Sequence, residues 1–251
     1  MNYALHWNNT APNYDREIFN VFKNDKNKKL KKYVTKYANK DIIAIDFGCG
    51  VGKALPMLSP LFKGIIAVDF SEKCIEKAKK SPHKNVEYKV VDLSAKKVDL
   101  PSVDFAFCCN VAMCDNIVLN KQIINNVLKA LNKGGTAIFV LPSMESVSVT
   151  AMSLINWYDT EGTDMADIPK SELENFTANN PKHLAEGIIV IDNVPTKHYL
   201  FTELYAMFNT SDFTMQKIDR LEYDWSTEFD SPPSWMQTPY PWDWVIEVKR
   251  K

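Results

Sequence analysis

A stretch of apolar residues that breaks into three glycines constrains this chain more than any other feature. Residues 42–52 read IIAIDFGCGVG, so an expected buried strand ends near Asp46 and glycines follow at Gly48, Gly50 and Gly52. Glycine lets the backbone take positive φ and approach a ligand closely, and a following helix offers unpaired N–H groups. The stretch predicts a nucleotide-binding turn, with an ordinary tight turn as the alternative.

The spacing of these glycines and the acid before them narrow the choice of ligand. Dinucleotide sites usually have G-x-G-x-x-G, whereas this turn has G-x-G-x-G with Lys53 at the sixth position. A carboxylate at Asp46 would repel a pyrophosphate but would attract a ligand that carries an ammonium and a sulfonium group. We therefore expect a positively charged adenosyl compound rather than a dinucleotide.

A second expected strand, residues 64–69, also ends in an acid. Asp69 follows Gly48 by 21 residues, the position at which doubly wound folds place a carboxylate that accepts hydrogen bonds from ribose hydroxyls. The alternative is that Asp69 caps a helix that starts near Ser71.

A third strand is expected over residues 86–91 and ends at Asp92 and Leu93. At this point an acid can accept a hydrogen bond from the adenine amine, and a leucine can pack on the ring. No helix is expected to follow, because residues 94–102 read as a loop.

The fourth expected strand, residues 104–109, runs into Asn110 and Val111. These two residues would border the ligand near its sulfonium. The alternative role for Asn110 is that of a turn residue.

Helical patterns separate these strands. Apolar spacing indicates helices over about residues 53–62 and 116–131, and residues 132–135 would cap the second helix before a fifth strand over 136–141. Strands that alternate with helices predict an α/β fold with a doubly wound parallel sheet.

In this order and spacing the chain resembles the class I S-adenosylmethionine-dependent methyltransferases of the small-molecule type. The matching pieces cover residues 42–141 and are DFGCGVG from Asp46, VDF at 68–70, VDL at 91–93 and LNKGG at 131–135.

The resemblance implies roles for individual residues. Gly48 and Gly50 would lie under the methionine part of S-adenosylmethionine, Asp69 would bind the ribose, and Asp92 would bind the adenine. The expected cofactor-binding residues are Tyr14, Asp46, Gly48, Cys49, Gly50, Asp69, Phe70, Asp92, Leu93, Asn110 and Val111.

The resemblance also implies the rest of the fold, a Rossmann-like sheet of seven strands with an antiparallel last strand. Residues 199–213 resemble the helix before the sixth strand, and the last two strands are expected near 215–224 and 244–249. The turn at 209–212 lacks the glycine that the family usually has there.

One domain over residues 1–251 is expected, because the length and the 45% hydrophobic fraction suit a single large core. Residues 1–40 would form an N-terminal helical cap, and 41–142 with 197–251 would form the cofactor-binding core. Residues 143–196 would be a lid inserted between the fifth strand and the following helix.

The lid is expected to shape the substrate pocket, because loops after the fourth and fifth strands overhang the ligand crevice of such sheets. It would contain a helix at 145–158 and a short strand at 188–191. The expected substrate-binding residues are Trp7, Trp157, Tyr158, Lys197, His198 and Tyr199.

Methyl transfer mainly requires that the acceptor be held in line at about 3 Å, because the sulfonium already activates the methyl group. For an acceptor that must lose a proton, an imidazole titrates in a suitable range, so His198 is the first catalytic candidate and Tyr14 the second. The alternative is that His198 is a surface or structural residue.

The expected activity is transfer of a methyl group from S-adenosylmethionine to a nitrogen or oxygen atom of a small molecule, with S-adenosylhomocysteine as the product. Aromatic and acidic residues after position 141 would suit an amine acceptor, and oxygen acceptors stay open. The alternatives are a nicotinamide-dependent dehydrogenase and a non-catalytic protein that binds the cofactor.

The charge distribution argues against nucleic acid as the substrate. The net charge is −1, but residues 1–140 carry 22 basic and 13 acidic residues, whereas residues 141–251 carry 8 and 18. An acidic substrate half repels a phosphate backbone. The eight lysines within 23–40 are expected on a solvated helix face.

The five cysteines are expected as free thiols in a cytoplasmic protein, since residues 1–20 lack an apolar signal sequence and no stretch reaches about 18 apolar residues. Adjacent Cys108 and Cys109 would point to opposite faces of a strand, so no metal site is expected. No membrane partner is expected, and the chain would be a monomer or a homodimer.

Overall fold

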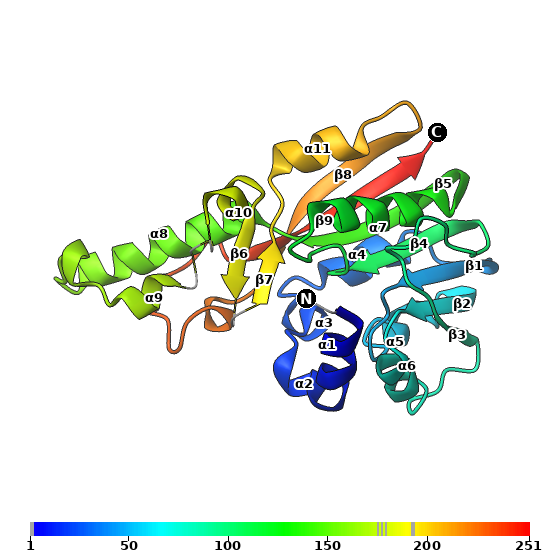
Figure 1. The fold of residues 1–251 in the computed structure, drawn as a ribbon, viewed down its shortest axis with the longest axis horizontal. Helices are drawn as coiled ribbons and strands as arrows, with labels where there is room; N and C mark the ends of the chain where they lie inside the picture. The colour runs from blue at the N-terminus through cyan, green and yellow to red at the C-terminus, as the bar shows by residue number, and fades with distance from the viewer. Residues whose placement is uncertain (1–2, 175, 177, 179, 192–193) are drawn as a thin grey trace.

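The computed structural model describes residues 3–174, 176, 178, 180–191 and 194–251. They form one seven-stranded sheet in the order β3-β2-β1-β4-β5-β9-β8, and a separate hairpin of β6 and β7 (Figure 1). β9 is antiparallel to both of its neighbours, whereas the pairs from β3 to β5 are parallel. The predicted seven-stranded α/β sheet with an antiparallel last strand is confirmed.

The strands of the main sheet lie close to the segments expected from the sequence. They are β1 Asn39–Phe47, β2 Phe62–Asp69, β3 Val86–Val90, β4 Val103–Cys109, β5 Leu131–Pro142, β8 Phe213–Glu222 and β9 Trp242–Arg250.

Helices cover both faces of this sheet and bury its side chains in two apolar clusters. One face packs against α7 (Ile117–Lys129) and α11 (Phe201–Phe208), and the other packs against α4 (Lys29–Thr35), α5 (Leu55–Leu58) and α6 (Glu72–Ala78). Strands that are buried on both faces need apolar residues at nearly every position, which explains the continuous apolar runs in the sequence.

The central strand β4 shows how alternate residues serve the two clusters. Phe105 and Phe107 lie in the cluster with α4 to α6, while Ala106 and Cys108 lie in the cluster with α7 and α11. Cys109 packs against the cluster with α4 to α6, so it faces away from Cys108. The prediction that Cys108 and Cys109 face opposite ways is confirmed.

The sequence-based prediction for residues 132–135 is wrong. Helix α7 ends at Lys129 with Ala130 as its C-cap, and β5 already begins at Leu131, which pairs with Val103. The glycines instead lie in a register shift inside β5, where a Cβ on Gly135 would come within 2.9 Å of the Asn132 carbonyl oxygen. Helix α5 is also shorter than expected, because β2 begins at Phe62.

Short helices precede the sheet and pack beside α6. They are α1 Tyr3–Thr10, the 3-10 turn η1 Ala11–Asn13, α2 Tyr14–Glu17 and α3 Val21–Asn24. Both α1 and η1 contact α6, so α6 lies between this segment and the sheet (Figure 1).

A projecting segment, which we call the arm, follows β5 (Figure 1). It consists of α8 (Met144–Thr160), η2 (Met165–Asp167) and α9 (Lys170–Glu174). Helix α10 (Pro181–Ala185) and the hairpin of β6 (Ile188–Ile191) and β7 (Val194–Lys197) come next, and the turn η3 (Trp225–Thr227) precedes β9. None of the described helices has the length and apolar character needed to cross a membrane.

The chain leaves the core for the arm and re-enters it at the same point. Ser143 and Tyr199 form an isolated parallel bridge, the Tyr199 N–H donates to the Pro142 carbonyl at 2.8 Å, and the Met144 N–H donates to the Tyr199 carbonyl at 3.1 Å.

Candidate active site

The glycine turn after β1 lies at the edge of the sheet where the parallel strands end. Gly48 and Gly50 have φ of +70° and +52°, a region that side chains disfavour. A Cβ on Gly48 would lie 2.3 Å from a methyl carbon of Val111, and one on Gly50 would lie 2.7 Å from the Tyr14 hydroxyl. Backbone conformation and space therefore both favour glycine at these two positions.

Asp46 lies at the end of β1 and is only 2% exposed. Its Oδ2 is buried and has no hydrogen-bond partner among the described residues. Burial, and secondly the nearby charge of Asp69, raise the pKa of Asp46 to about 8. A buried acceptor without a partner is costly, so Asp46 is suited to a ligand that brings hydrogen-bond donors and positive charge.

Asp69, at the end of β2, connects the glycine turn to α6. Its Oδ2 accepts from the Gly50 N–H at 2.8 Å and its Oδ1 accepts from the Ser71 N–H at 2.9 Å. Burial raises the pKa of Asp69, while these backbone donors lower it. The N-cap of α6 is Ser71, whose side chain accepts from the Cys74 N–H, so the alternative that Asp69 is the cap is wrong.

Polar contacts fix the N-terminal helices beside this turn. Ser71 Oγ donates to Asn8 Oδ1 at 2.7 Å, and Lys77 Nζ donates to the Ala11 carbonyl at 3.2 Å. Asp15 forms ion pairs with Lys53 and Lys77.

These contacts place Trp7 and Tyr14 near the glycines, with ring centroids 6.0 Å apart. Burial, followed by the charge of Asp69, raises the pKa of Tyr14, so its hydroxyl stays protonated near neutral pH.

The structure places the other predicted cofactor residues around the same edge but in different environments. Asp92 is exposed, and its Oδ1 accepts from Ser94 N at 2.8 Å and from Ser94 Oγ at 2.6 Å. Leu93 is buried in the core cluster of α7, Cys49 is buried, and Phe70 is half-buried. Their contacts with a cofactor stay predictions.

Asn110 lies just after β4 and connects this edge to the reversed strand. Its φ is +52°, and its Nδ2 donates to Asp243 Oδ2 at 3.0 Å, while its Oδ1 is buried without a partner among the described residues. The Tyr223 hydroxyl donates to the same Asp243 oxygen at 2.7 Å. Burial raises the pKa of Asp243, and these two donors lower it.

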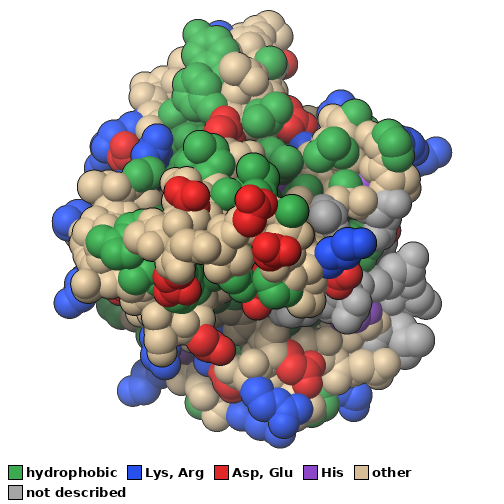
Figure 2. Space-filling model, turned by 90° about the vertical axis from the view of Figure 1, so that its left-hand side faces the viewer, with side chains coloured by type: hydrophobic (Ala, Val, Ile, Leu, Met, Phe, Trp, Pro, Cys, Tyr) green, Lys and Arg blue, Asp and Glu red, His purple; other side chains and the backbone are tan. Residues whose placement is uncertain are grey.

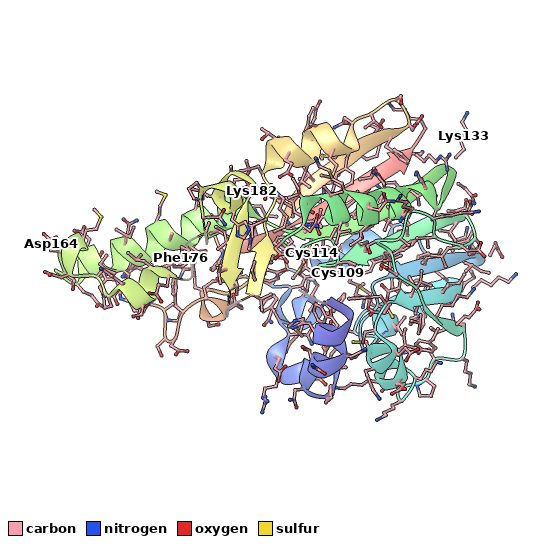
Figure 3. The ribbon with its side chains drawn as sticks, in the orientation of Figure 1. Cys109, Cys114, Lys133, Asp164, Phe176 and Lys182 are labelled. Atoms are coloured by element: carbon pink, nitrogen blue, oxygen red, sulfur yellow. The ribbon has the colours of Figure 1, made fainter. Side chains whose placement is uncertain are left out.

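Sequence reasoning missed Asp243 and Tyr223. The predicted reversal of the last strand could have pointed to Asp243. An antiparallel strand starts at the edge where the parallel strands end, so its first residues lie beside the site. Figure 3 labels Cys109 and Cys114, which lie in the middle of the molecule at and after the end of β4.

Lys197, His198 and Tyr199 are buried, with exposed fractions of 3%, 5% and 1%. Lys197 Nζ donates to Glu203 Oε2 at 2.7 Å and lies 4.6 Å from the Tyr199 ring centroid. The Tyr199 hydroxyl donates to the Ala112 carbonyl at 2.5 Å. The Lys197 and Tyr199 side chains thus bond to the protein itself, and their predicted contact with a substrate stays untested.

His198 faces the backbone of its own segment. Its Nδ1 lies 3.0 Å from the Thr196 carbonyl, and burial lowers its pKa to about 4. The imidazole is therefore neutral at pH 7 and able to accept a proton, but only weakly basic. Its role as a general base stays a prediction.

Trp157 and Tyr158 lie near the far end of α8. Trp157 Nε1 donates to Glu161 Oε1 at 2.6 Å, and its ring lies 5.9 Å from that of Phe229. Thirteen residues of helix separate Met144 from Trp157, which is about 20 Å. Figure 3 shows Asp164, beyond the helix, at the tip of the arm. The structure does not bring these two aromatics together with Asp46.

Comparison with known proteins now adds to this geometry. The profile of a methyltransferase domain matches residues 44–135. Residues 44–135 are thus similar to the methyltransferase domain. The match begins within β1 and ends in the glycines of β5, so the matched stretch contains Asp46, Asp69 and Asn110.

Solved methyltransferases share the fold along the whole chain. The N-methyltransferase NodS of Bradyrhizobium japonicum, in complex with S-adenosylhomocysteine, has a TM-score of 0.60 at 11% identity and covers 100% of this chain and 99% of its own. The DhpI complex with S-adenosylhomocysteine scores 0.62 at 13% identity, covering 98% and 94%. Magnesium protoporphyrin IX methyltransferase of Synechocystis scores 0.61 at 12% identity, covering 99% and 95%. The chain therefore has the class I methyltransferase fold.

A putative methyltransferase of Dictyostelium discoideum is 33% identical over 96 residues, which are 38% of this chain. The chain spans about a third of that relative's length, 31%.

Proposed function

We propose that this chain transfers a methyl group from S-adenosylmethionine to a small molecule. The observation that carries the proposal is Asp46 Oδ2, a buried carboxyl oxygen without a partner among the described residues, next to a turn whose positive φ and close contacts favour glycine. A buried carboxyl group without a partner beside a glycine turn suits the ammonium of a methionine group, which brings both positive charge and hydrogen-bond donors.

The residues at this edge fit such a cofactor. Asp46, with Gly48 beside it, would hold the methionine part. Asp69 would accept from the ribose hydroxyls, because its two oxygens have four lone pairs and the Gly50, Ser71 and Phe70 N–H groups use three of them. Asp92 is the remaining acid for the adenine amine. The side chains of Tyr14 and Val111 cover the glycines, so cofactor binding has to displace them.

The cofactor supplies a methyl group that its sulfonium already activates. The protein's contribution is then to hold the acceptor in line and to exclude water. The N-terminal helices, fixed by Asn8 and Asp15, support the second task by covering the turn. Tyr14 and His198 are the candidates for proton transfer that the sequence predicts, and the raised pKa of Tyr14 keeps its hydroxyl protonated, which makes it the weaker candidate for a base.

A nicotinamide dinucleotide fits this edge less well. Its pyrophosphate would lie close to Asp46 and Asp69, two buried carboxylates, and the Gly50 N–H that a phosphate would use already donates to Asp69. The structural relatives that carry S-adenosylhomocysteine support the same choice of cofactor.

The arm supports a small-molecule acceptor rather than a nucleic acid. Residues 144–174 carry seven acidic residues and one lysine. Figure 2 looks onto this end of the molecule and shows acidic side chains across the middle of the face. We propose that residues 143–196 act as the lid of a substrate pocket in a cytoplasmic enzyme that is a monomer or a homodimer.

Titration of the purified chain with S-adenosylhomocysteine tests the proposal. At about 100 times its dissociation constant the ligand should add roughly 2.7 kcal/mol of stability and raise the melting temperature. NAD at the same concentration should leave the melting temperature unchanged, and a shift with NAD alone would contradict the proposal. Labelled methyl transfer into a metabolite extract then separates an enzyme from a protein that only binds the cofactor.

Proton release from Asp46 is a second way to measure the binding of S-adenosylhomocysteine. Free Asp46 is mostly protonated at pH 7, and an ammonium beside it favours the carboxylate, so binding should release close to one proton. Calorimetry in phosphate and in Tris buffer would show this release as a difference in heat. Asp46→Asn should abolish the difference.

A further inference from the structure

A second buried carboxylate, Asp243 of the reversed strand β9, lies at the edge of the sheet where the parallel strands end. Asp243 starts β9 opposite Pro142 of β5, and it is 9% exposed. β9 and β1 are three strand spacings apart, about 14 Å. Asp46 and Asp243 thus lie on the two sides of the loop that follows β4.

The loop after β4 connects the two acids. Asn110 lies between their strands and donates to Asp243. In the register of the sheet Asp46 pairs with Phe107 of β4, and Asp243 pairs with Pro142, two residues beyond the partner of Cys109 in β5, so the two acids flank the end of β4. A group bound between them would lie beside the methyl donor that we propose for Asp46.

The groups of Asp243 and Asn110 that still lack a hydrogen-bond partner are oxygen atoms, which accept hydrogen bonds. Both hydrogen bonds of Asp243 fall on Oδ2, from Asn110 and Tyr223, which leaves its Oδ1. Asn110 has used its amide donor, and its Oδ1 is buried without a partner. Among the described residues, no salt bridge joins Asp243 to a basic side chain.

We propose that Asp243 Oδ1 and Asn110 Oδ1 bind the nitrogen of an amine acceptor, and that Asp243 takes a proton from it. This inference rests on the proposed function. A protonated amine has up to three N–H donors and a positive charge, which match two acceptors and an unpaired carboxylate. A carboxylate acceptor would have no donor to offer and would be repelled.

The chemical step balances with these groups. A proton moves from the substrate ammonium to the Asp243 carboxylate, which frees the nitrogen lone pair. That pair forms the new N–C bond as the methyl–sulfur bond breaks, and the electrons of the broken bond remain on sulfur. Burial raises the pKa of Asp243, which makes it a stronger proton acceptor than an exposed carboxylate.

The first test identifies the class of acceptor. The purified chain is incubated with S-adenosylmethionine carrying a deuterated methyl group and with a metabolite extract split on a cation-exchange resin. Label should appear on nitrogen in products from the cationic fraction. Label from the flow-through alone, or no product while S-adenosylhomocysteine still binds, overturns the amine inference. Failure to bind S-adenosylhomocysteine instead overturns the proposed function.

The second test uses Asp243→Asn and Asp243→Glu with the labelled cationic fraction. If Asp243 takes the proton, Asp243→Asn should lose about 100-fold or more in turnover, and Asp243→Glu should recover part of it, with S-adenosylhomocysteine binding retained in both. A merely structural acceptor would be better replaced by the isosteric Asn. Turnover that is higher in Asp243→Asn than in Asp243→Glu therefore overturns the role.

A matched control comes from the other end of β4. Asp104 is an exposed aspartate that also accepts from an asparagine amide, that of Asn132 at 2.9 Å. Asp104→Asn should leave turnover unchanged. If Asp243→Asn does not give a cooperative melt, the comparison of Asp243→Glu with wild type decides, and an unchanged turnover in Asp243→Glu contradicts the proposal.

Discussion

The Tyr14 hydroxyl lies against the main chain of Gly50, in the space that a side chain at this position would need. The N-terminal helices and the turn after β1 are therefore shaped to each other, although they are 36 residues apart.

Gly50→Ala should be more destabilising than a glycine replacement at an open position. A positive φ costs an alanine about 1–2 kcal/mol, and here the new Cβ would also collide with Tyr14. Gly134→Ala is the control, because Gly134 has φ of +80° and no atom within 4 Å of its Cβ position. Urea unfolding of both variants measures the difference, and equal losses would show that the Tyr14 contact has no energetic weight.

Asp46 should make the ligand-free protein less stable as the pH rises. Its folded pKa of about 8 lies above the ordinary value of 3.8, so the native state binds more protons than the unfolded state between these values. The free energy of unfolding should fall by several kcal/mol from pH 4 to pH 8. In Asp46→Asn this decline should be smaller, and identical pH profiles for the two proteins would contradict the raised pKa.

Asp69→Ala should weaken both the cofactor site and the fold. Loss of charged hydrogen bonds to ribose should cost about 1.5–3 kcal/mol of S-adenosylhomocysteine binding, measured by calorimetry. The Gly50 and Ser71 N–H groups would also lose their acceptor. Asn116→Ala is the control for a lost N-cap alone, since it removes the cap of α7 at about 1 kcal/mol of stability and should leave ligand affinity unchanged. Unchanged affinity in Asp69→Ala would remove its role in binding.

His198 should contribute to acid sensitivity. Its folded pKa of about 4 lies below the ordinary 6.5, so the stability present above pH 6.5 is lost as the pH falls through 4. The loss should reach about 3 kcal/mol and should be smaller in His198→Asn, which urea unfolding at pH 7 and pH 4.5 would show. Methyl transfer by the same variant at pH 7 tests the base role, because normal turnover would leave His198 structural.

The sequence predicted the parts of this molecule that depend on local chemistry. The apolar run before Asp46 and the glycines after it specify a strand and a turn with positive φ, whatever the rest of the chain does. The strand ends at Asp69 and Cys109 were recognised for the same reason.

Contacts between residues that are far apart in the sequence could not be predicted from local patterns. Tyr199 was expected at a substrate pocket, but its hydroxyl finds a backbone acceptor at Ala112, on a loop 87 residues away. Asp243 reaches the site edge through the pairing of β9 with β5 and β8, which no local pattern encodes. Polar side chains in a folded protein are placed by their partners, and the sequence does not name those partners.

The meeting of Ser143 with Tyr199 has an evolutionary consequence. Because the two ends of the segment between these residues meet at one point, its length and sequence can change while the sheet keeps its register. If this segment forms the substrate lid that we propose, its exchange alone would change the methyl acceptor and leave the cofactor site as it is.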